Sequence, residues 1–192
     1  MKTSFYSEEE LVDLGFKSIG DYVLISRFAQ FYHPENIIIG SHVRIDDFCI
    51  LSAGKEIIIG NYVHIACYSS ILGAEQVLLS DYSGLSGRVS IYSSTDDYLG
   101  SAMTNPTIPA KYTNVQSAPV FLGKHVIIGA GSVILPGISI GEGAAIGALS
   151  LVSQDCEPHY LYTGNPARKR IERKKRYLEL EILLEKDGKL MK

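Results

Sequence analysis

Residues 120–152 have the sequence VFLGKHVIIGAGSVILPGISIGEGAAIGALSLV, in which an apolar residue recurs at every sixth position. The same period runs through residues 19–91, so both stretches together contain eighteen such sites. All hold Ile, Leu, Val or Phe; the sites are positions 19, 25, 31, 39, 45, 51, 59, 65, 71, 79, 85, 91, 122, 128, 134, 140, 146 and 152. Because 46% of the chain is hydrophobic, chance would fill them all with a probability on the order of one in a million.

A longer period is superimposed on the first. The segments that begin at Ile37, Ile57 and Val77 are spaced by 20 residues, and the last two segments by 18. A six-residue unit is a short strand with a turn, and it is too small to bury its apolar face alone. Three units are therefore expected to close a triangular coil, and stacked coils to align the apolar sites in one core. A β-sandwich would instead show alternation and Asn-Gly hairpin turns, and the sequence has no Asn-Gly pair.

The segments outside the repeat are expected to form caps and a loop. Ser7 to Glu10 form a capping box, and Gly15 is a stop signal, so a short helix should cap the first coil. Residues 97–119 contain three prolines and interrupt the repeat, and loops of that length are usually functional.

A helix is also expected from Pro166 onward, with apolar Ile171, Leu178 and Ile182 on one side. The expected organisation is a cap helix (residues 1–16), a β-helix domain (residues 17–164) and a C-terminal helix (residues 165–192).

Composition and charge exclude several classes of protein. A net charge of −3 and a pI near 5.9 give no reason to expect nucleic acid as a partner. Three widely spaced cysteines match neither a disulfide framework nor a zinc signature, and no two histidines lie close on one coil, so no metal site is expected. No run of 18 apolar residues occurs, and the first ten residues lack a signal-peptide core, which favours a cytoplasmic protein without a membrane partner.

The chain resembles the hexapeptide-repeat acyltransferases, and within them the bacterial sugar acetyltransferases of surface-polysaccharide biosynthesis. The resemblance covers nearly the whole chain and is strongest over residues 122–155 and the segment TGNPARKRI at 163–171. It implies an all-β, left-handed parallel β-helix that uses acetyl-CoA as co-substrate. It also implies a homotrimer whose active sites lie between neighbouring subunits, with the long loop reaching across each one.

The resemblance also implies where CoA binds. In this family the pantetheine arm lies in a groove between adjacent β-helices, held by backbone N–H groups that correspond to those of Ala130 and Ala148. Ser153 and Gln154 match a Thr-Lys stretch that contacts CoA, although Gln here replaces the Lys.

At the nucleotide end of CoA, Asn165 and Arg168 match the Gly-Asn-Pro-x-Arg segment of the family, and Lys169 follows them. Seven Lys or Arg lie between positions 168 and 176, at the expected start of a helix, which is an arrangement that suits polyphosphate. A solvated charged face accounts for most of the seven equally well.

The chain departs from the family at the catalytic base. The family places a His at the root of the long loop, whereas this chain has Asp96 there, in the string Ser94-Thr95-Asp96-Asp97-Tyr98. Among its five histidines, His64 is the best alternative base, because it precedes a core site and should point outward from a β-helix face.

An Asp at the base position favours an amine as the acceptor. A sugar hydroxyl must lose its proton as it attacks a thioester, so it needs a base with a pKa near neutrality. A sugar amine attacks as the free base, and a weak carboxylate or water suffices. The expected acceptor is therefore the amino group of a nucleotide-linked sugar. A sugar hydroxyl, a non-sugar acceptor and a non-catalytic scaffold are the alternatives, and the intact CoA segments disfavour the scaffold.

Overall fold

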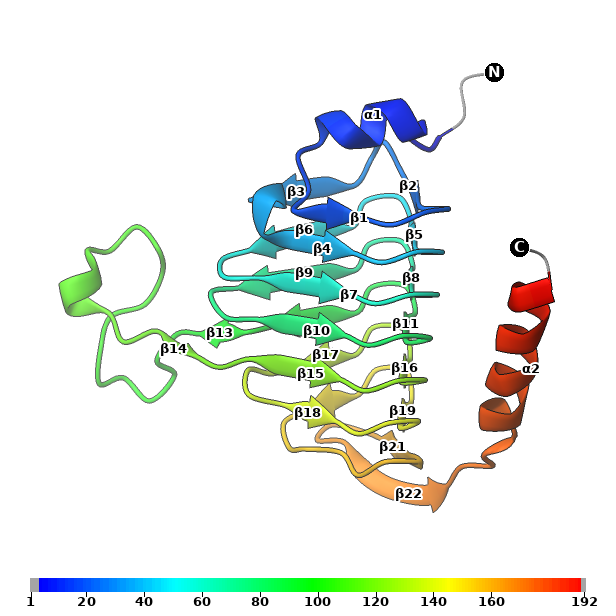
Figure 1. Cartoon of the computed structure of the whole chain (residues 1–192). Helices are drawn as coiled ribbons and strands as arrows, with labels where there is room; N and C mark the ends of the chain where they lie inside the picture. The colour runs from blue at the N-terminus through cyan, green and yellow to red at the C-terminus, as the bar shows by residue number, and fades with distance from the viewer. Residues whose placement is uncertain (1–3, 191–192) are drawn as a thin grey trace.

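The protein is a parallel β-solenoid with one helix at the N-terminal and one at the C-terminal end of the chain, in a computed structural model that describes residues 4–190 (Figure 1). Face one consists of β1 (Ser18–Ile19), β4 (Ile37–Ile39), β7 (Ile57–Ile59), β10 (Val77–Leu79), β15 (Val120–Leu122) and β18 (Ser139–Ile140). Face two consists of β2 (Leu24–Ile25), β5 (Arg44–Ile45), β8 (His64–Ile65), β11 (Gly84–Leu85), β16 (Ile127–Ile128), β19 (Ala145–Ile146), β21 (Tyr160–Thr163) and β22 (Arg168–Glu172). Face three consists of β3 (Gln30–Tyr32), β6 (Ile50–Ala53), β9 (Ser70–Gly73), β12 (Ser90–Tyr92), β17 (Val133–Ile134) and β20 (Leu151–Val152).

The predicted periodicity is confirmed by the core. Of the eighteen apolar sites, all but Ile19 and Phe31 are buried, and these two, in the first coil, pack against the core. Equivalent residues of successive coils pair in register, as Ile39 does with Ile59 and Ile59 with Leu79. Each six-residue unit thus contributes one large side chain to a continuous column inside the triangle.

The corners of the triangle are two-residue turns. The first corner, between faces one and two, contains residues 21–22, 41–42, 61–62, 81–82 and 124–125; the second corner, between faces two and three, contains residues 47–48, 67–68, 87–88, 130–131 and 148–149. The second residue of each pair has a positive φ, for example 57° at Tyr62 and 61° at Arg88, a conformation that is uncommon for residues other than Gly. At the first corner, ring stacking offsets this cost: Tyr22, His42, Tyr62, Tyr82 and His125 stack in sequence.

The N-terminal helix has the predicted capping box. Helix α1 (Glu8–Asp13) begins after Ser7, whose hydroxyl accepts from the Glu10 N–H while the Glu10 carboxylate accepts from the Ser7 N–H. Its Leu11 is buried against the first coil, which would otherwise expose the end of the core to solvent. Gly15 follows the helix with a φ of 75°, as expected for a stop residue.

The long loop leaves the solenoid through a two-stranded antiparallel ribbon. Strands β13 (Ser94–Thr95) and β14 (Gln116–Ser117) form its base, and the loop projects well away from the stack (Figure 1). A short 3₁₀ helix, Ala110–Tyr112, lies in its distal part. The repeat resumes at Val120, whose strand β15 pairs directly with β10, so the insertion leaves the register of the coils intact.

The prediction of a helix from Pro166 onward is wrong for its first ten residues. Residues Arg168–Glu172 form β22, which pairs antiparallel with β21, and helix α2 spans Arg176–Leu190. Without β22, strand β21 would be a free edge with unpaired N–H and C=O groups at the end of the solenoid. Backbone pairing at that edge overrides the helical propensity of the Lys- and Arg-rich segment. Ile171 and Ile182, expected on an apolar side, are 65% and 54% exposed in the single chain.

Helix α2 turns back along the solenoid (Figure 1), and its Glu181 attaches it to the first corner. Glu181, 12% exposed, lies 2.6 Å from both the Lys124 ammonium and the His125 ring. The hydrogen bonds from Lys124 and His125 outweigh the effect of burial, so the pKa of the Glu181 carboxyl is below its ordinary value. Tyr177 completes the contact against His125 and His159.

The period-six column predicts a sharp contrast between two neighbouring residues of β6. Leu51 is fully buried and Ile50 is 40% exposed on the opposite side of the strand. We expect Leu51→Ala to lower the free energy of unfolding by about 2–5 kcal/mol, because it opens a cavity in the column. Ile50→Ala is the matched control, expected to cost under about 1 kcal/mol. Urea titrations at one protein concentration measure both values, and equal losses would contradict the assignment of the core.

Candidate functional site

A groove runs along the second corner of the solenoid. It has a volume of about 460 Å³, and four successive coils each contribute two residues to it. The residues are Cys67, Tyr68, Gly87, Arg88, Ala130, Gly131, Ala148 and Leu149. Two predicted CoA contacts, Ala130 and Ala148, thus lie in one groove.

The first residue of each pair is small and carries a backbone N–H without a partner. The N–H groups of Gly87, Ala130 and Ala148 donate no hydrogen bond to any residue that the structure describes. Their carbonyls, in contrast, are used: those of Gly87 and Ala130 accept from the N–H groups of Gly131 and Leu149. Along this groove the coils therefore present a row of free donors, one for each coil.

The first corner shows how such donors are satisfied elsewhere in the same fold. The N–H of Ser41 donates to the Asn61 side chain at 2.8 Å, and the N–H of Asn61 donates to Asp81 at 2.7 Å. Each acceptor is the side chain of the equivalent residue in the next coil. At the groove these positions hold Gly and Ala, which have no acceptor to offer. The N–H groups of the groove are therefore open to an acceptor from a ligand or from solvent.

The expected nucleotide-end residues lie just beyond the downstream end of the groove. The turn at residues 164–167 is tied to the last coil, because Leu151 donates to the Gly164 carbonyl and Ala167 donates to that of Leu151. Arg168 is exposed, and its guanidinium makes no hydrogen bond or ion pair with any residue that the structure describes, although its backbone pairs with that of Thr163. Lys169, in contrast, pairs with Glu157 at 2.6 Å and lies over the Tyr160 ring.

The helix argument for phosphate binding at this point is wrong. Because α2 begins only at Arg176, Asn165 and Arg168 lie at a turn and at the start of β22, with no helix N-terminus beside them. Ser153 and Gln154 are exposed and follow β20, across face three from the groove, which they do not line in this chain.

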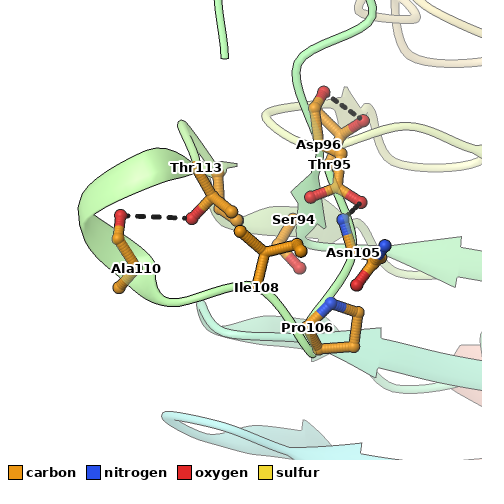
Figure 2. Close-up of a pocket in the computed structure, with 9 residues that line it drawn as sticks. Ser94, Thr95, Asp96, Asn105, Pro106, Ile108, Ala110 and Thr113 are labelled. Carbon is orange, nitrogen blue, oxygen red and sulfur yellow. Dashed lines mark hydrogen bonds between the residues drawn. The ribbon is translucent and has the colours of Figure 1, made fainter. Parts of the chain in front are cut away.

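A second pocket lies within the base of the long loop and contains Asp96. Its volume is about 430 Å³, and Figure 2 shows Asp96 and Asn105 on one side with Ala110 and Thr113 on the other. The Asn105 N–H lies 3.4 Å from the Asp96 carboxylate, a long contact that leaves most of its acceptor capacity unused. Asp96 is partly exposed, so its carboxylate is accessible to a ligand.

The neighbouring Asp97 has a structural task. It is 9% exposed and accepts hydrogen bonds from the Ser101 hydroxyl and from the N–H groups of Leu99 and Ala102. These hydrogen bonds, that of Ser101 first, lower the pKa of its carboxyl below the ordinary value. Asp97 thereby fixes the start of the loop and leaves Asp96 oriented toward the pocket.

His64 lies apart from both pockets. It is on face two, half exposed, with its Nε2 2.8 Å from the Asp46 carboxylate, which also accepts from Arg44 at 2.7 Å. Burial raises the pKa of Asp46, but the hydrogen bonds from His64 and Arg44 outweigh it, and the net pKa is lowered. His64 lines neither the groove nor the loop pocket of the described chain.

Sequence reasoning missed most of the groove. Cys67, Tyr68, Arg88 and Leu149 line the groove, and none of them was predicted to lie at a CoA site. A signal was present in the coil spacing: Gly87 lies one coil before Ala130, and Cys67 lies one coil, or 20 residues, before Gly87.

In the described part of the chain no group of His, Cys, Asp or Glu side chains is placed to hold a metal ion, and no helix is long and apolar enough to cross a membrane.

Comparisons with known proteins agree with this geometry. Residues 119–154 match the family model described as bacterial transferase hexapeptide (six repeats). The dTDP-4-amino-4,6-dideoxy-D-glucose acyltransferase of Escherichia coli is 54% identical over 179 residues, 93% of each chain. A chloramphenicol acetyltransferase of Klebsiella aerogenes is 48% identical, but over only 33% of this chain.

Solved structures extend the likeness to the whole fold. The N-acyltransferase AntD from Bacillus cereus, in complex with dTDP-4-amino-4,6-dideoxyglucose and coenzyme A, superposes with a TM-score of 0.94 at 46% identity, over 97% of this chain and 100% of its own. AntD has also been crystallised with dTDP and 3-hydroxybutyryl-CoA. A maltose O-acetyltransferase from Clostridium difficile, at 22% identity and a TM-score of 0.55, shares the fold alone.

One classification follows from three observations. They are the free N–H groups of the groove, the in-register hexapeptide coils, and 54% identity across almost the full length of a curated relative. This protein belongs to the hexapeptide-repeat acyltransferases, in the group that contains the N-acyltransferases of dTDP-linked amino sugars.

Proposed function

We propose that the protein transfers an acyl group from acyl-CoA to the amino group of a dTDP-linked 4-amino-4,6-dideoxy sugar. The observation that carries this proposal is the row of free N–H groups at Gly87, Ala130 and Ala148. Two of the relatives described above support the acceptor, because the Escherichia coli enzyme is named for this sugar nucleotide and AntD from Bacillus cereus has been crystallised in complex with it. Three free thiols, at Cys49, Cys67 and Cys156, suit a reducing cytoplasm.

The pantetheine arm of CoA fits the row of donors. Paired strands of successive coils are about 4.8 Å apart, so the free N–H groups repeat at nearly that interval. The two amide carbonyls of pantetheine are separated by four bonds, which is about one such interval when extended. We place these carbonyls on Ala148 and Ala130. The nucleotide end of CoA then lies toward Asn165 and Arg168, and the thioester lies toward Gly87.

In this alignment the N–H of Gly87 meets the thioester carbonyl. When the amine nitrogen attacks, the C–N bond forms and the carbonyl electron pair moves to oxygen. The Gly87 N–H then donates to the developing oxyanion. As the intermediate collapses, the C–S bond breaks, CoA leaves as a thiolate, and the ammonium loses its extra proton.

Asp96 and Ser86 are the side chains that we assign to the acceptor amine. AntD has been crystallised as variants of a serine and of an aspartate ten residues further along its chain. In this chain Ser86 and Asp96 are the only Ser-to-Asp pair with that spacing. Ser86 directly precedes the groove residue Gly87 in the chain, and Asp96 lines the loop pocket. We assign Asp96 to orient the amine and collect its proton, with His64 as the alternative base.

The site is completed by assembly of the protein into a homotrimer. The groove and the loop pocket have no residue in common, and they flank opposite ends of β12 on face three. A thioester in the groove is therefore separated from Asp96 of its own chain by a strand. A threefold arrangement, in which the groove of one subunit faces the loop of the next, would join them. It would also bring Ser153 and Gln154 of a neighbour toward CoA and cover exposed Tyr98 and Leu99 of the loop.

Transfer to a sugar hydroxyl or to a non-sugar acceptor are the alternatives. The maltose O-acetyltransferase shares only the fold with this chain, and the chloramphenicol enzyme matches only a third of it. Neither similarity indicates which acceptor this protein uses. The absence of a histidine from the residues lining the described loop pocket also disfavours a hydroxyl, which needs a stronger base.

Blocking the row of free donors should weaken CoA binding. Ala130 lines the groove, and a Leu at this position would occupy the space expected for pantetheine. We expect Ala130→Leu to raise the Kd for CoA by about tenfold or more, through steric exclusion. Ala74→Leu, at an exposed position away from the groove, is the matched control and should leave the Kd unchanged. Calorimetric titration measures both, and an unchanged Kd for Ala130→Leu would place CoA elsewhere.

The two cations near the turn should contribute unequally. The Arg168 guanidinium has no partner among the described side chains, whereas the Lys169 ammonium is already paired with Glu157. We expect Arg168→Ala to raise the Kd for CoA by about three- to tenfold, and Lys169→Ala by less, because a charge-assisted contact is lost only in the first. Comparing CoA with dephospho-CoA locates the contact. If the wild-type protein binds both equally well, the phosphate assignment is wrong.

The role of Asp96 predicts a modest loss of turnover. Asp96→Asn should lower kcat by about 10- to 100-fold, below the range for removal of a full general base, because the amine needs orientation more than deprotonation. His64→Ala should change kcat by less than about threefold, since His64 lies outside both pockets. Thiol release in steady state gives both numbers. Loss of activity in His64→Ala with full activity in Asp96→Asn would reverse the assignment and favour a hydroxyl acceptor.

A further inference from the structure

The groove continues for one coil beyond Gly87. Its last two lining residues are Cys67 and Tyr68, and the next pair of the second corner, Asp47 and Phe48, does not line it. If CoA lies as proposed above, with its thioester carbonyl at Gly87, the pantetheine arm occupies the downstream coils. The space at Cys67 and Tyr68 is then left for the group attached to the carbonyl. We propose that Cys67 and Tyr68 form the acyl subsite, and that the size of the Cys67 side chain sets the length of the acyl group.

The position of the Cys67 sulfur supports this assignment. A Cβ placed on Gly87 would lie 3.8 Å from the Cys67 Sγ, within van der Waals contact, with otherwise only the Cys67 carbonyl oxygen, at 3.3 Å, nearby. The sulfur therefore projects to the open side of Gly87, where the acyl carbons would extend. Cys67 is exposed in the chain, in contrast to Cys49 and Cys156, which are buried.

Tyr68 forms a fixed wall beside this space. The Tyr68 ring stacks on that of Phe48 with ring centroids 5.0 Å apart. The guanidinium of Arg88, in the next coil of the same corner, lies 5.3 Å from the centroid of the Tyr68 ring. A side chain held on both sides yields little to a bulky ligand. The adjustable dimension of the subsite is therefore the residue at position 67.

The length of the space distinguishes short from longer acyl groups. One coil interval of about 4.8 Å accommodates roughly three to four carbon atoms in extended form. The Cys67 thiol occupies part of that interval. An acetyl methyl reaches about one bond beyond the carbonyl, whereas a butyryl chain reaches three and would contact the sulfur. This chain should accordingly prefer acetyl-CoA to butyryl-CoA. Because its sulfur is soft and apolar, Cys67 suits contact with an alkyl group.

The decisive experiment measures acyl preference in size variants at position 67. The purified full-length protein is assayed with dTDP-4-amino-4,6-dideoxyglucose and with acetyl-, butyryl- or 3-hydroxybutyryl-CoA, following thiol release. We expect Cys67→Ala to raise the butyryl-to-acetyl ratio of kcat/KM by about tenfold, the usual effect of a one-carbon change in a pocket. Cys67→Leu should lower the same ratio by a similar factor, and Cys67→Ser, of nearly equal size, should leave it within about twofold.

Leu149→Ala is the matched control at the other end of the groove. Leu149 lines the segment assigned to pantetheine, so its truncation should raise KM for every acyl-CoA by the same factor without altering their ratio. This control separates selection of the acyl group from general binding of CoA. A change in Cys67→Ser as large as that in Cys67→Ala would show that thiol chemistry, and not size, is responsible, and would overturn the inference.

The remaining outcomes separate the inference from the proposed function on which it rests. If the enzyme turns over but Cys67→Ala and Cys67→Leu both keep the wild-type ratio, the acyl group lies elsewhere and only the inference falls. If the wild-type protein neither binds CoA nor acylates the sugar nucleotide, the proposed function fails and the inference with it. Should Cys67→Leu not fold, the alanine variant and direct competition of acetyl- and butyryl-CoA in the wild-type protein decide the question. A wild-type preference for butyryl-CoA would overturn it.

Discussion

Parallel pairing of one coil with the next is the interaction on which everything else in this protein depends. It places equivalent residues about 4.8 Å apart along the axis, so each position in the coil becomes a column through the molecule. The inward columns are Ile, Leu and Val, as from Ile39 to Ile59 and Leu79, and these form the core. The outward columns follow the same rule, whether they contain stacked rings at the first corner or free N–H groups at the second. The insertion of residues 97–119 is tolerated because it leaves at one corner and the columns resume unchanged.

The difference between the two corners explains why one of them leaves a groove that a ligand can enter. Both have the same backbone, with a positive φ at the second residue and an N–H at the first that no backbone carbonyl accepts. At the first corner, side chains such as Asn61 and Asp81 accept from the coil before them. At the second, Gly87, Ala130 and Ala148 lack any such acceptor, so the same donors remain available and the space above them stays open. A small change of side chain on the same backbone thus converts a closed turn into an open groove with free donors.

The sequence predicted the columns better than the ends of the chain. All eighteen apolar sites lie in or against the core, and the capping box at Ser7 is present, because both depend on local spacing. Residues 166–175 were wrongly predicted as helix, since strand β22 within them is imposed by the free edge of β21, a tertiary effect that propensity does not contain. Ala130 and Ala148, the predicted CoA contacts, line one groove, whereas Cys67 and Tyr68 in the same groove were not predicted, because the 43-residue step across the loop hides their coil relationship to Ala130. Nothing in the local sequence indicated that His64 would pair with Asp46, away from both pockets.

The two adjacent carboxylates at the loop root, Asp96 and Asp97, have different surroundings and suit different roles. Asp97 is buried, and its oxygens are engaged by Ser101, Leu99 and Ala102, so it holds the loop in place and is unsuited to receive a proton. Asp96 has only the long contact from Asn105 and faces the pocket. A histidine at position 96 would supply a stronger base, which a hydroxyl acceptor requires, whereas an amine already carries the lone pair that attacks. A carboxylate can instead orient an ammonium or amine by charge and hydrogen bonding, and still accept the proton released after C–N bond formation. Asp96, at the position where the resemblance implies a histidine, is therefore consistent with an amine acceptor.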